Sequence, residues 1–168
     1  MNKIECSKCD QKAKTVRGSY TLEDVGIPVV LQGIEIIHCD HCGNEDPIIP
    51  GINDLMRALA VAVICKPYRL RGEEIRFLRK HVEMTGDEFA RLIDVDKTTL
   101  SKWENNDDPV GKNSDRLIRL TVLGIGDGLQ EKLVEVIRTV FPKIKQSKSR
   151  IPPRVKFEIN PDLSHQYA

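Results

Sequence analysis

The 168-residue chain lacks any long apolar run, and this absence excludes a membrane-spanning helix. No stretch approaches the roughly 18 consecutive apolar residues that such a helix needs. Residues 1–14 are polar and contain cysteine, so they do not resemble the apolar core of a secretory signal. We therefore expect a cytoplasmic protein, in which paired cysteines indicate metal or redox chemistry before disulfides.

Signatures of catalysis are also missing. The sequence contains no Ser/His/Asp constellation, no glycine-rich phosphate loop and no paired-carboxylate arrangement. We therefore predict that the protein is not an enzyme. Aromatic residues make up only 5% of the chain, while 40% is hydrophobic and 30% charged. This composition is typical of a folded soluble protein with one or two domains.

A strong overall charge is absent as well, since the formal net charge is +1. The charge is unevenly distributed. Residues 1–50 carry five Lys/Arg against eight Asp/Glu, whereas residues 143–156 carry six basic residues and no acid. The middle of the chain, residues 66–120, is nearly neutral. Any nucleic acid must therefore bind there through basic side chains gathered on one face, since the overall electrostatic field of this part is weak.

Four of the five cysteines form two C-x-x-C pairs, Cys6/Cys9 and Cys39/Cys42. Each pair can present two thiolates to one ion, and two pairs complete a tetrahedral zinc shell. The 29 residues between Cys9 and Cys39 suffice for a small sheet that returns to its start. Because four cysteines leave no open coordination position, we predict one structural Zn²⁺ that supplies much of the folding energy of this small domain.

Other residues near the cysteine pairs leave alternatives open. A single C-x-x-C can be a redox dithiol, but neither pair lies in the βαβ pattern typical of thioredoxin-like proteins. His38 and His41 could replace a zinc ligand, although we favour a surface or supporting position for both. Cys65 stands alone in an apolar segment and is interpreted as a small buried hydrophobe.

The order of elements predicts an α+β fold with two domains. β-rich runs at 28–31 and 34–37 indicate two or three short antiparallel strands, and residues 43–53 are expected to be a loop. A helix over 54–65, capped by Asn53 and ended by Pro67, leads to short amphipathic segments. We predict a four-cysteine zinc domain at residues 1–50, followed by a linker helix and extended link at residues 51–71. An all-α helix-turn-helix domain at residues 72–141 and a basic flexible tail at residues 142–168 complete the chain.

Residues 85–106 carry the second strong pattern. Thr85 and Glu88 are spaced as a capping box, and Ala90 is small where two helices would cross. Leu100 and Trp103 lie three residues apart and are expected to face the core. The polar positions of the same segment then form an outer face suited to the major groove. We predict these DNA contacts: Lys97, Thr98, Thr99, Ser101 and Lys102.

Two turns are expected to bound this second helix. Residues 94–96 make a tight turn in which Asp96 caps the helix, and Asn105-Asn106 can end it in left-handed geometry. A plain helical bundle with a solvated polar face is the alternative interpretation.

The runs 74–80, 84–90 and 95–106 resemble the Xre/Cro-type helix-turn-helix. Joined to an N-terminal double C-x-x-C domain, residues 3–123 are similar to the YgiT-type zinc-finger regulators. The resemblance implies a sequence-specific repressor that is the antitoxin of a type II toxin–antitoxin pair. Its zinc domain would bind a small ribonuclease toxin, and its C-terminal domain would dimerise on a palindromic operator. Two positions differ from the pattern of the family. An arginine often stands at the position of Lys102, and Gly86 stands where the family usually has a glutamine that contacts phosphate.

Two further expectations concern partners. A stand-alone zinc-containing transcription regulator without a toxin is the alternative function. The homodimer surface is predicted at residues 129–140, where an apolar stripe comprises Leu129, Leu133, Val136, Ile137 and Val140.

Overall fold

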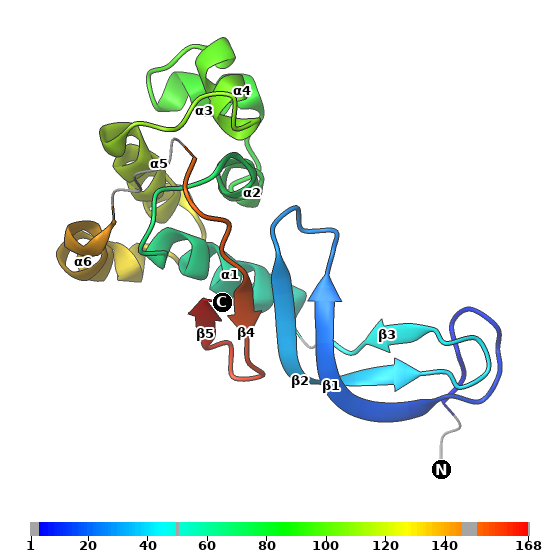
Figure 1. Ribbon diagram of the computed structural model, residues 1–168. Coiled ribbons are helices and arrows are strands. Elements are labelled where there is room, and N and C mark those ends of the chain that lie inside the picture. Colours follow the sequence, from blue (N-terminus) through cyan, green and yellow to red (C-terminus); the bar gives the residue numbers. More distant parts are fainter. Residues whose placement is uncertain (1–3, 50, 146–150, 168) are drawn as a thin grey trace.

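The computed structural model describes residues 4–49, 51–145 and 151–167, and it has the predicted α+β class (Figure 1). A β-rich N-terminal part precedes a helical part. The strands are β1 (Lys14–Leu22), β2 (Val29–His38), β3 (Glu45–Pro47), β4 (Phe157–Ile159) and β5 (His165–Tyr167). The main helices are α1 (Ile52–Cys65), α2 (Gly72–His81), α3 (Gly86–Leu92), α4 (Lys97–Glu104) and α5 (Lys112–Ile125). Short helical turns then fill 130–143 and include α6 (Leu133–Glu135).

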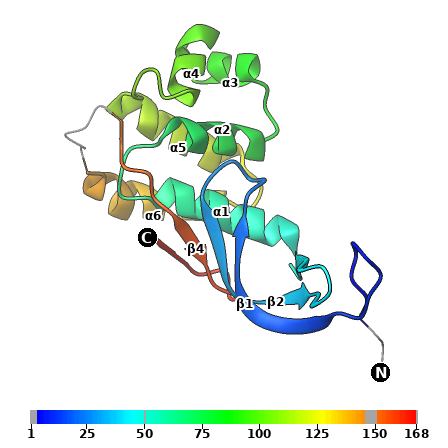
Figure 2. The same ribbon diagram turned by 45° about the vertical axis from the view of Figure 1, so that its right-hand side comes forward.

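The sheet is organised around β2, as Figure 2 shows. On one side β1 pairs antiparallel along the whole of β2, from Lys14 opposite His38 to Leu22 opposite Val29. On the other side, β3 pairs with the end of β2 near the cysteines and β4 pairs in parallel with its beginning. The predicted strand runs 28–31 and 34–37 therefore belong to one strand. Gly33 lies between them at φ 61°, a conformation that glycine adopts without steric cost.

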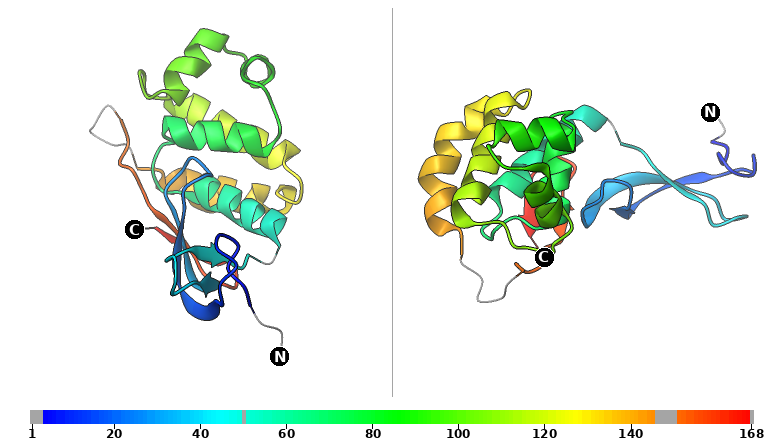
Figure 3. Two further views of the ribbon diagram at one scale, coloured as in Figure 1. Left: turned by 90° about the vertical axis from the view of Figure 1, so that its right-hand side faces the viewer. Right: turned by 90° about the horizontal axis from the view of Figure 1, so that it is seen from above.

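The N-terminal half of β2 belongs to the main hydrophobic core. Val29 and Leu31 are buried in the same cluster as Leu59 and Ile64 of α1 and Leu123 of α5. The cysteine end of the sheet has a separate, much smaller cluster and projects away from the helices (Figure 3). The sheet therefore begins inside the helical core and ends outside it.

Helices α2, α3 and α4 are the short amphipathic segments predicted to follow the link after α1. The capping box is also confirmed: the backbone amide of Glu88 donates to the Thr85 hydroxyl, and the Thr85 amide donates to the Glu88 carboxylate at 2.8 Å. The cap predicted at Asn53 is wrong, because α1 begins at Ile52 after Gly51, whose φ is 72°.

Helices α2, α3 and α4 end in the same left-handed turn. Glu83, Asp94 and Asn106 follow them with φ values of 57°, 54° and 60°. In each turn the next amide bonds the carbonyl five residues back, as in the Schellman motif. The left-handed ending is thus confirmed at Asn106. The other two turns lack the glycine or asparagine that would have predicted them.

The C-terminal segment differs from the flexible tail predicted for 142–168. Phe157 and Ile159 of β4 are fully buried beside β2, and β5 pairs with β4. The Tyr167 hydroxyl donates to the Ala62 carbonyl of α1 at 2.9 Å. These three-residue strands are too short to show a periodic pattern, and their pairing with β2 spans more than a hundred residues. Of the predicted tail, residues 146–150 and 168 lie outside the described residues.

The apolar stripe at 129–140 also differs from the prediction. Leu129 and Val136 are fully buried, and Leu133 and Val140 pack against the same core. The stripe therefore packs on its own chain rather than forming a free dimer surface, and Ile137 is the stripe residue that stays exposed. Within the described residues, none of the helices is long and apolar enough to cross a membrane.

Gly72 allows α2 to begin directly against the end of α4. A Cβ atom at this position would lie 2.4 Å from the carbonyl oxygens of Trp103 and Glu104. The Gly72 amide also donates to the side chain of Asn106 at 2.8 Å. The position of α4 relative to α2 therefore depends on the missing side chain.

We predict that Gly72→Ala lowers the free energy of unfolding by about 1–3 kcal/mol, because the backbone of α4 must move to admit the methyl group. Gly86→Ala is the matched control. A Cβ atom at Gly86 meets no atom within 4 Å, so its stability should change by less than about 0.5 kcal/mol. Urea unfolding of both variants measures the difference. Equal stabilities would contradict the close helix contact.

Candidate zinc centre and nucleic-acid interface

The structure brings the four paired cysteines together. All four sulfur atoms lie within 4.8 Å of one another. The Sγ atoms of Cys6 and Cys42 are 3.6 Å apart, as are those of Cys9 and Cys39. A tetrahedral ion with Zn–S bonds of about 2.3 Å requires sulfur atoms about 3.8 Å apart. The four thiols therefore fit one structural zinc ion.

Each C-x-x-C pair lies on a tight turn that points both thiols to one side. In the first turn the Asp10 amide donates to the Cys6 carbonyl at 3.0 Å, and Asp10 has φ 59°. In the second, the Gly43 amide donates to the Cys39 carbonyl at 2.9 Å, and Gly43 has φ 69°. The two turns have the same construction, so each contributes two ligands in the same arrangement.

The electrostatics of the cluster favour a cation at its centre. The backbone amide of Cys42 donates to the Cys39 sulfur and lowers the pKa of that thiol to about 6. For Cys9, a backbone hydrogen bond from Gln11 lowers the pKa, but burial and the neighbouring thiols outweigh it and raise the pKa to about 12. The thiolate of Cys39 is thus stabilised, while Cys9 beside it resists a second negative charge. A divalent ion that replaces the remaining protons would resolve this conflict.

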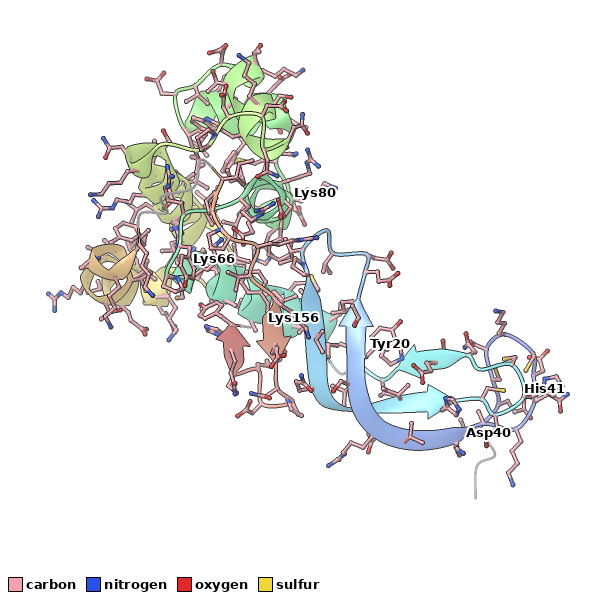
Figure 4. The ribbon with its side chains drawn as sticks, viewed as in Figure 1. Tyr20, Asp40, His41, Lys66, Lys80 and Lys156 are labelled. Carbon is pink, nitrogen blue, oxygen red and sulfur yellow. The ribbon has the colours of Figure 1, made fainter. Side chains whose placement is uncertain are left out.

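The histidines near the cluster are not among the ligands. The ring nitrogens of His38 lie 3.3 Å from the carboxylates of Asp40 and Glu45. His41 is exposed at the outer tip of the sheet, as Figure 4 shows. Cys65 is half-buried in α1 and does not belong to the cluster.

Sequence reasoning missed a polar contact that joins the two cysteine turns. The Ser7 hydroxyl donates to the Asp46 carboxylate at 2.6 Å, and the side-chain amide of Asn44 donates to the same carboxylate at 2.9 Å. Ser7 follows Cys6 in the first turn, whereas Asn44 and Asp46 follow the second. These hydrogen bonds fix the position of the first cysteine turn relative to the second.

Helices α3 and α4 have the arrangement of a helix-turn-helix. Phe89 and Ala90 of α3 and Leu100 and Trp103 of α4 are buried, as predicted. The opposite face of α4 is open to solvent. Asp96 precedes α4 but makes no side-chain cap to its backbone. Its carboxylate instead accepts a hydrogen bond from the Thr99 hydroxyl at 3.0 Å.

The five predicted DNA contacts divide into two groups. Thr99 is partly covered, and the exposed ones are Lys97, Thr98, Ser101 and Lys102. The Lys97 ammonium lies 3.0 Å from the carboxylate of Asp87 on α3. Lys102 makes no side-chain ion pair with any described residue, and its charge is available to an anionic partner.

A buried carboxylate fixes the direction of α4. Glu104, its last residue, accepts hydrogen bonds from Arg79 at 2.7 and 3.0 Å and from Arg76 at 3.2 Å. Both arginines lie on α2. A second guanidinium nitrogen of Arg76 donates to the side chain of Asn105 at 2.8 Å. Asn105 is exposed one turn after Ser101, and sequence reasoning did not include it in the interface.

Comparison with known proteins agrees with this arrangement. Residues 75–120, from α2 to α5, match the model of a helix-turn-helix family. The match supports a DNA-binding transcription regulator. No curated protein and no solved structure matches the chain.

We predict that the purified chain holds one zinc ion and that chelation unfolds the cysteine end of the sheet but not the helices. Among the described residues, the buried hydrophobic members of the small cluster around the cysteines are Cys6, Ala13 and Cys39, too few to hold it without metal. Elemental mass spectrometry measures the zinc, and amide hydrogen exchange locates the unfolding.

Cys39→Ser should lose the zinc, whereas the matched control Cys65→Ser should keep one ion per chain. Unchanged amide protection of residues 4–22 and 35–47 after chelation would show that the metal does not stabilise this end.

Proposed function

We propose that this protein is a sequence-specific transcriptional repressor that reads its operator with α4. The exposed face of α4 carries the proposal. Two lysines and two hydroxyl side chains project from a helix whose other face is buried. An α-helix fits the major groove of B-DNA, where such donors can bond base edges.

The residues of this face have different roles in the proposed complex. Lys102 is free of ion pairs within the described residues and can donate to guanine O6 and N7. Lys97 is held beside Asp87, which favours a phosphate contact at the rim of the groove. Thr98 and Ser101 provide short donors between the two lysines. Repression would follow from occupation of the promoter, since no described feature suggests an activating surface.

We further propose that the repressor is an antitoxin and controls its own operon. Two C-x-x-C pairs before a helix-turn-helix resemble the zinc-finger antitoxins noted above. Residues 1–50 carry a formal charge of −3, and a zinc tetrathiolate adds about −2. This end would attract a basic ribonuclease toxin. A zinc-containing regulator without a toxin is the alternative.

Binding as a homodimer belongs to the same proposal. One helix-turn-helix reads a half-site, and two copies related by a two-fold axis match a palindromic operator. Because the stripe at 129–140 packs largely on its own chain, the dimer would need another surface or the exposed remainder of this segment. Val134 and Ile137 are the exposed apolar side chains there.

We predict that Lys102→Ala weakens binding to the upstream DNA of its own gene by about 1–3 kcal/mol and relaxes selectivity at one base pair. Fluorescence anisotropy at one salt concentration compares this DNA with a random duplex of equal length. Lys132→Ala is the matched control, because Lys132 pairs with Glu135 outside the helix-turn-helix. An equal loss on both duplexes would place Lys102 on phosphate rather than on a base.

The antitoxin proposal predicts a stoichiometric complex with the product of the neighbouring gene. That product should be a small basic protein that arrests growth when expressed alone and is neutralised by co-expression of this chain. Affinity purification from the native host followed by intact-mass measurement identifies it. A chain that purifies without a partner yet binds its own upstream DNA would be a stand-alone repressor.

A further inference from the structure

An apolar socket opens where the sheet meets the start of α1. Its volume is about 210 Å³. Six parts of the chain line it: β1, β2, residues 48–49, α1, β4 and the turn between β4 and β5. The apolar lining includes Leu31, Ile34, Ile48, Leu55, Ile159 and Leu163. Neither the zinc site nor the helix-turn-helix uses any of these side chains.

One wall of the socket is conformationally strained. Leu163 lies in the β4–β5 turn with φ 64°, a left-handed conformation that costs an ordinary L-residue roughly 1–2 kcal/mol. Leu163 is nevertheless 37% exposed at the socket rim, so a third of this apolar residue stays in contact with water in the free chain. Ile48 across the rim is 40% exposed. A strained residue that presents an apolar side chain to solvent indicates a contact outside the chain.

The size of the socket indicates what fits in it. A cavity of about 150 Å³ with an apolar lining holds one benzene molecule, whereas small-molecule sites usually measure about 300–1,000 Å³. The socket is therefore large enough for one aromatic or large aliphatic side chain and small for a typical metabolite. The exposed rim extends the apolar surface beyond the opening, as in a protein interface with one buried anchor.

The charges around the socket select the kind of partner. Glu35 and Arg17 both line the socket. The Arg17 guanidinium lies 3.7 Å from the Glu35 carboxylate. Asp162, in the β4–β5 turn that lines the socket, is a second acid. Hydrogen bonds from Ser164 lower the pKa of its carboxyl group. With the charge of −3 on residues 1–50, this surrounding favours a basic protein.

We propose that the socket receives one apolar side chain from a basic partner protein. This proposal rests on the proposed antitoxin function, and it places the toxin on β2 and the C-terminal hairpin rather than at the zinc-bearing tip. The C-terminal strands then have a role in recognition, since Ile159, Pro161 and Leu163 complete the socket.

The first test uses indole as a neutral probe of the socket. The zinc-loaded full chain with labelled Ile and Leu methyl groups is titrated with indole and followed by NMR. We expect saturable shifts at Ile34, Ile48 and Leu163, and an affinity at least tenfold weaker for Leu163→Asp. The control Ile125→Asp alters a residue that is 45% exposed at the end of α5 and should bind indole as the wild type does. Absence of saturable shifts would overturn the socket.

The second test uses the neighbouring gene product and Leu163→Asn. Asparagine tolerates the left-handed turn, so this variant should melt at the wild-type temperature or above while binding the partner at least tenfold more weakly. The control Ile125→Asn should bind the partner with the wild-type affinity. Wild-type affinity for Leu163→Asn would overturn the assignment of the partner.

The outcomes separate this proposal from the antitoxin function. If the product of the neighbouring gene does not bind the wild-type chain, both the antitoxin function and the assignment of the partner are contradicted. The indole titration then still decides whether the socket binds an apolar group. Sedimentation of the chain alone tests a second copy as occupant. A dimer that Leu163→Asp dissociates would overturn the basic partner.

Discussion

A fully buried guanidinium, that of Arg119 on α5, is the contact on which the arrangement of the helices depends. It pairs with Asp115 at 3.0 Å and donates to the carbonyls of Ile64, Lys66 and Tyr68. Removing a charge from water costs several kcal/mol unless its donors are matched. Here the matching acceptors are the carbonyls at and beyond the end of α1, which have no partner within the helix. The same bonds therefore satisfy the charge and fix the path of the chain after α1.

This path determines where the DNA-facing helix lies. Asp115 also accepts the Leu70 amide at 2.6 Å, and the buried Lys66 pairs with Glu74 of α2. The link between α1 and α2 is thus anchored along its length, and α2 begins in a fixed direction. From α2, the arginines that bind Glu104 hold α4. The exposed face of α4 is positioned by buried ion pairs as much as by apolar packing.

The sequence predicted those features that depend on neighbours along the chain. The capping box at Thr85, the burial of Leu100 and Trp103 and each C-x-x-C pair follow from spacing alone, because three residues place their side chains together. The two cysteine pairs lie 29 residues apart, and only the four ligands that zinc needs predicted their meeting. The C-terminal strands and the pairs of Glu104 did not follow, since partners distant in sequence leave no local pattern. The stripe at 129–140 was detected correctly as apolar. The helical spacing of its apolar residues could not show whether they pack against the same chain or against a second copy.

The continuity of β2 limits how a partner can influence DNA binding. The strand runs without interruption from beside Cys39 to Val29 in the main core, and β4 and Tyr167 fasten its inner end to α1. α1 in turn is held by Arg119. In closely packed elements of this kind, moving one element requires its neighbours to repack, so their relative positions resist change. A protein seated on the socket would thus occupy a fixed place relative to α4. Its effect on repression would arise from its bulk and charge beside the DNA rather than from a change of shape in the repressor.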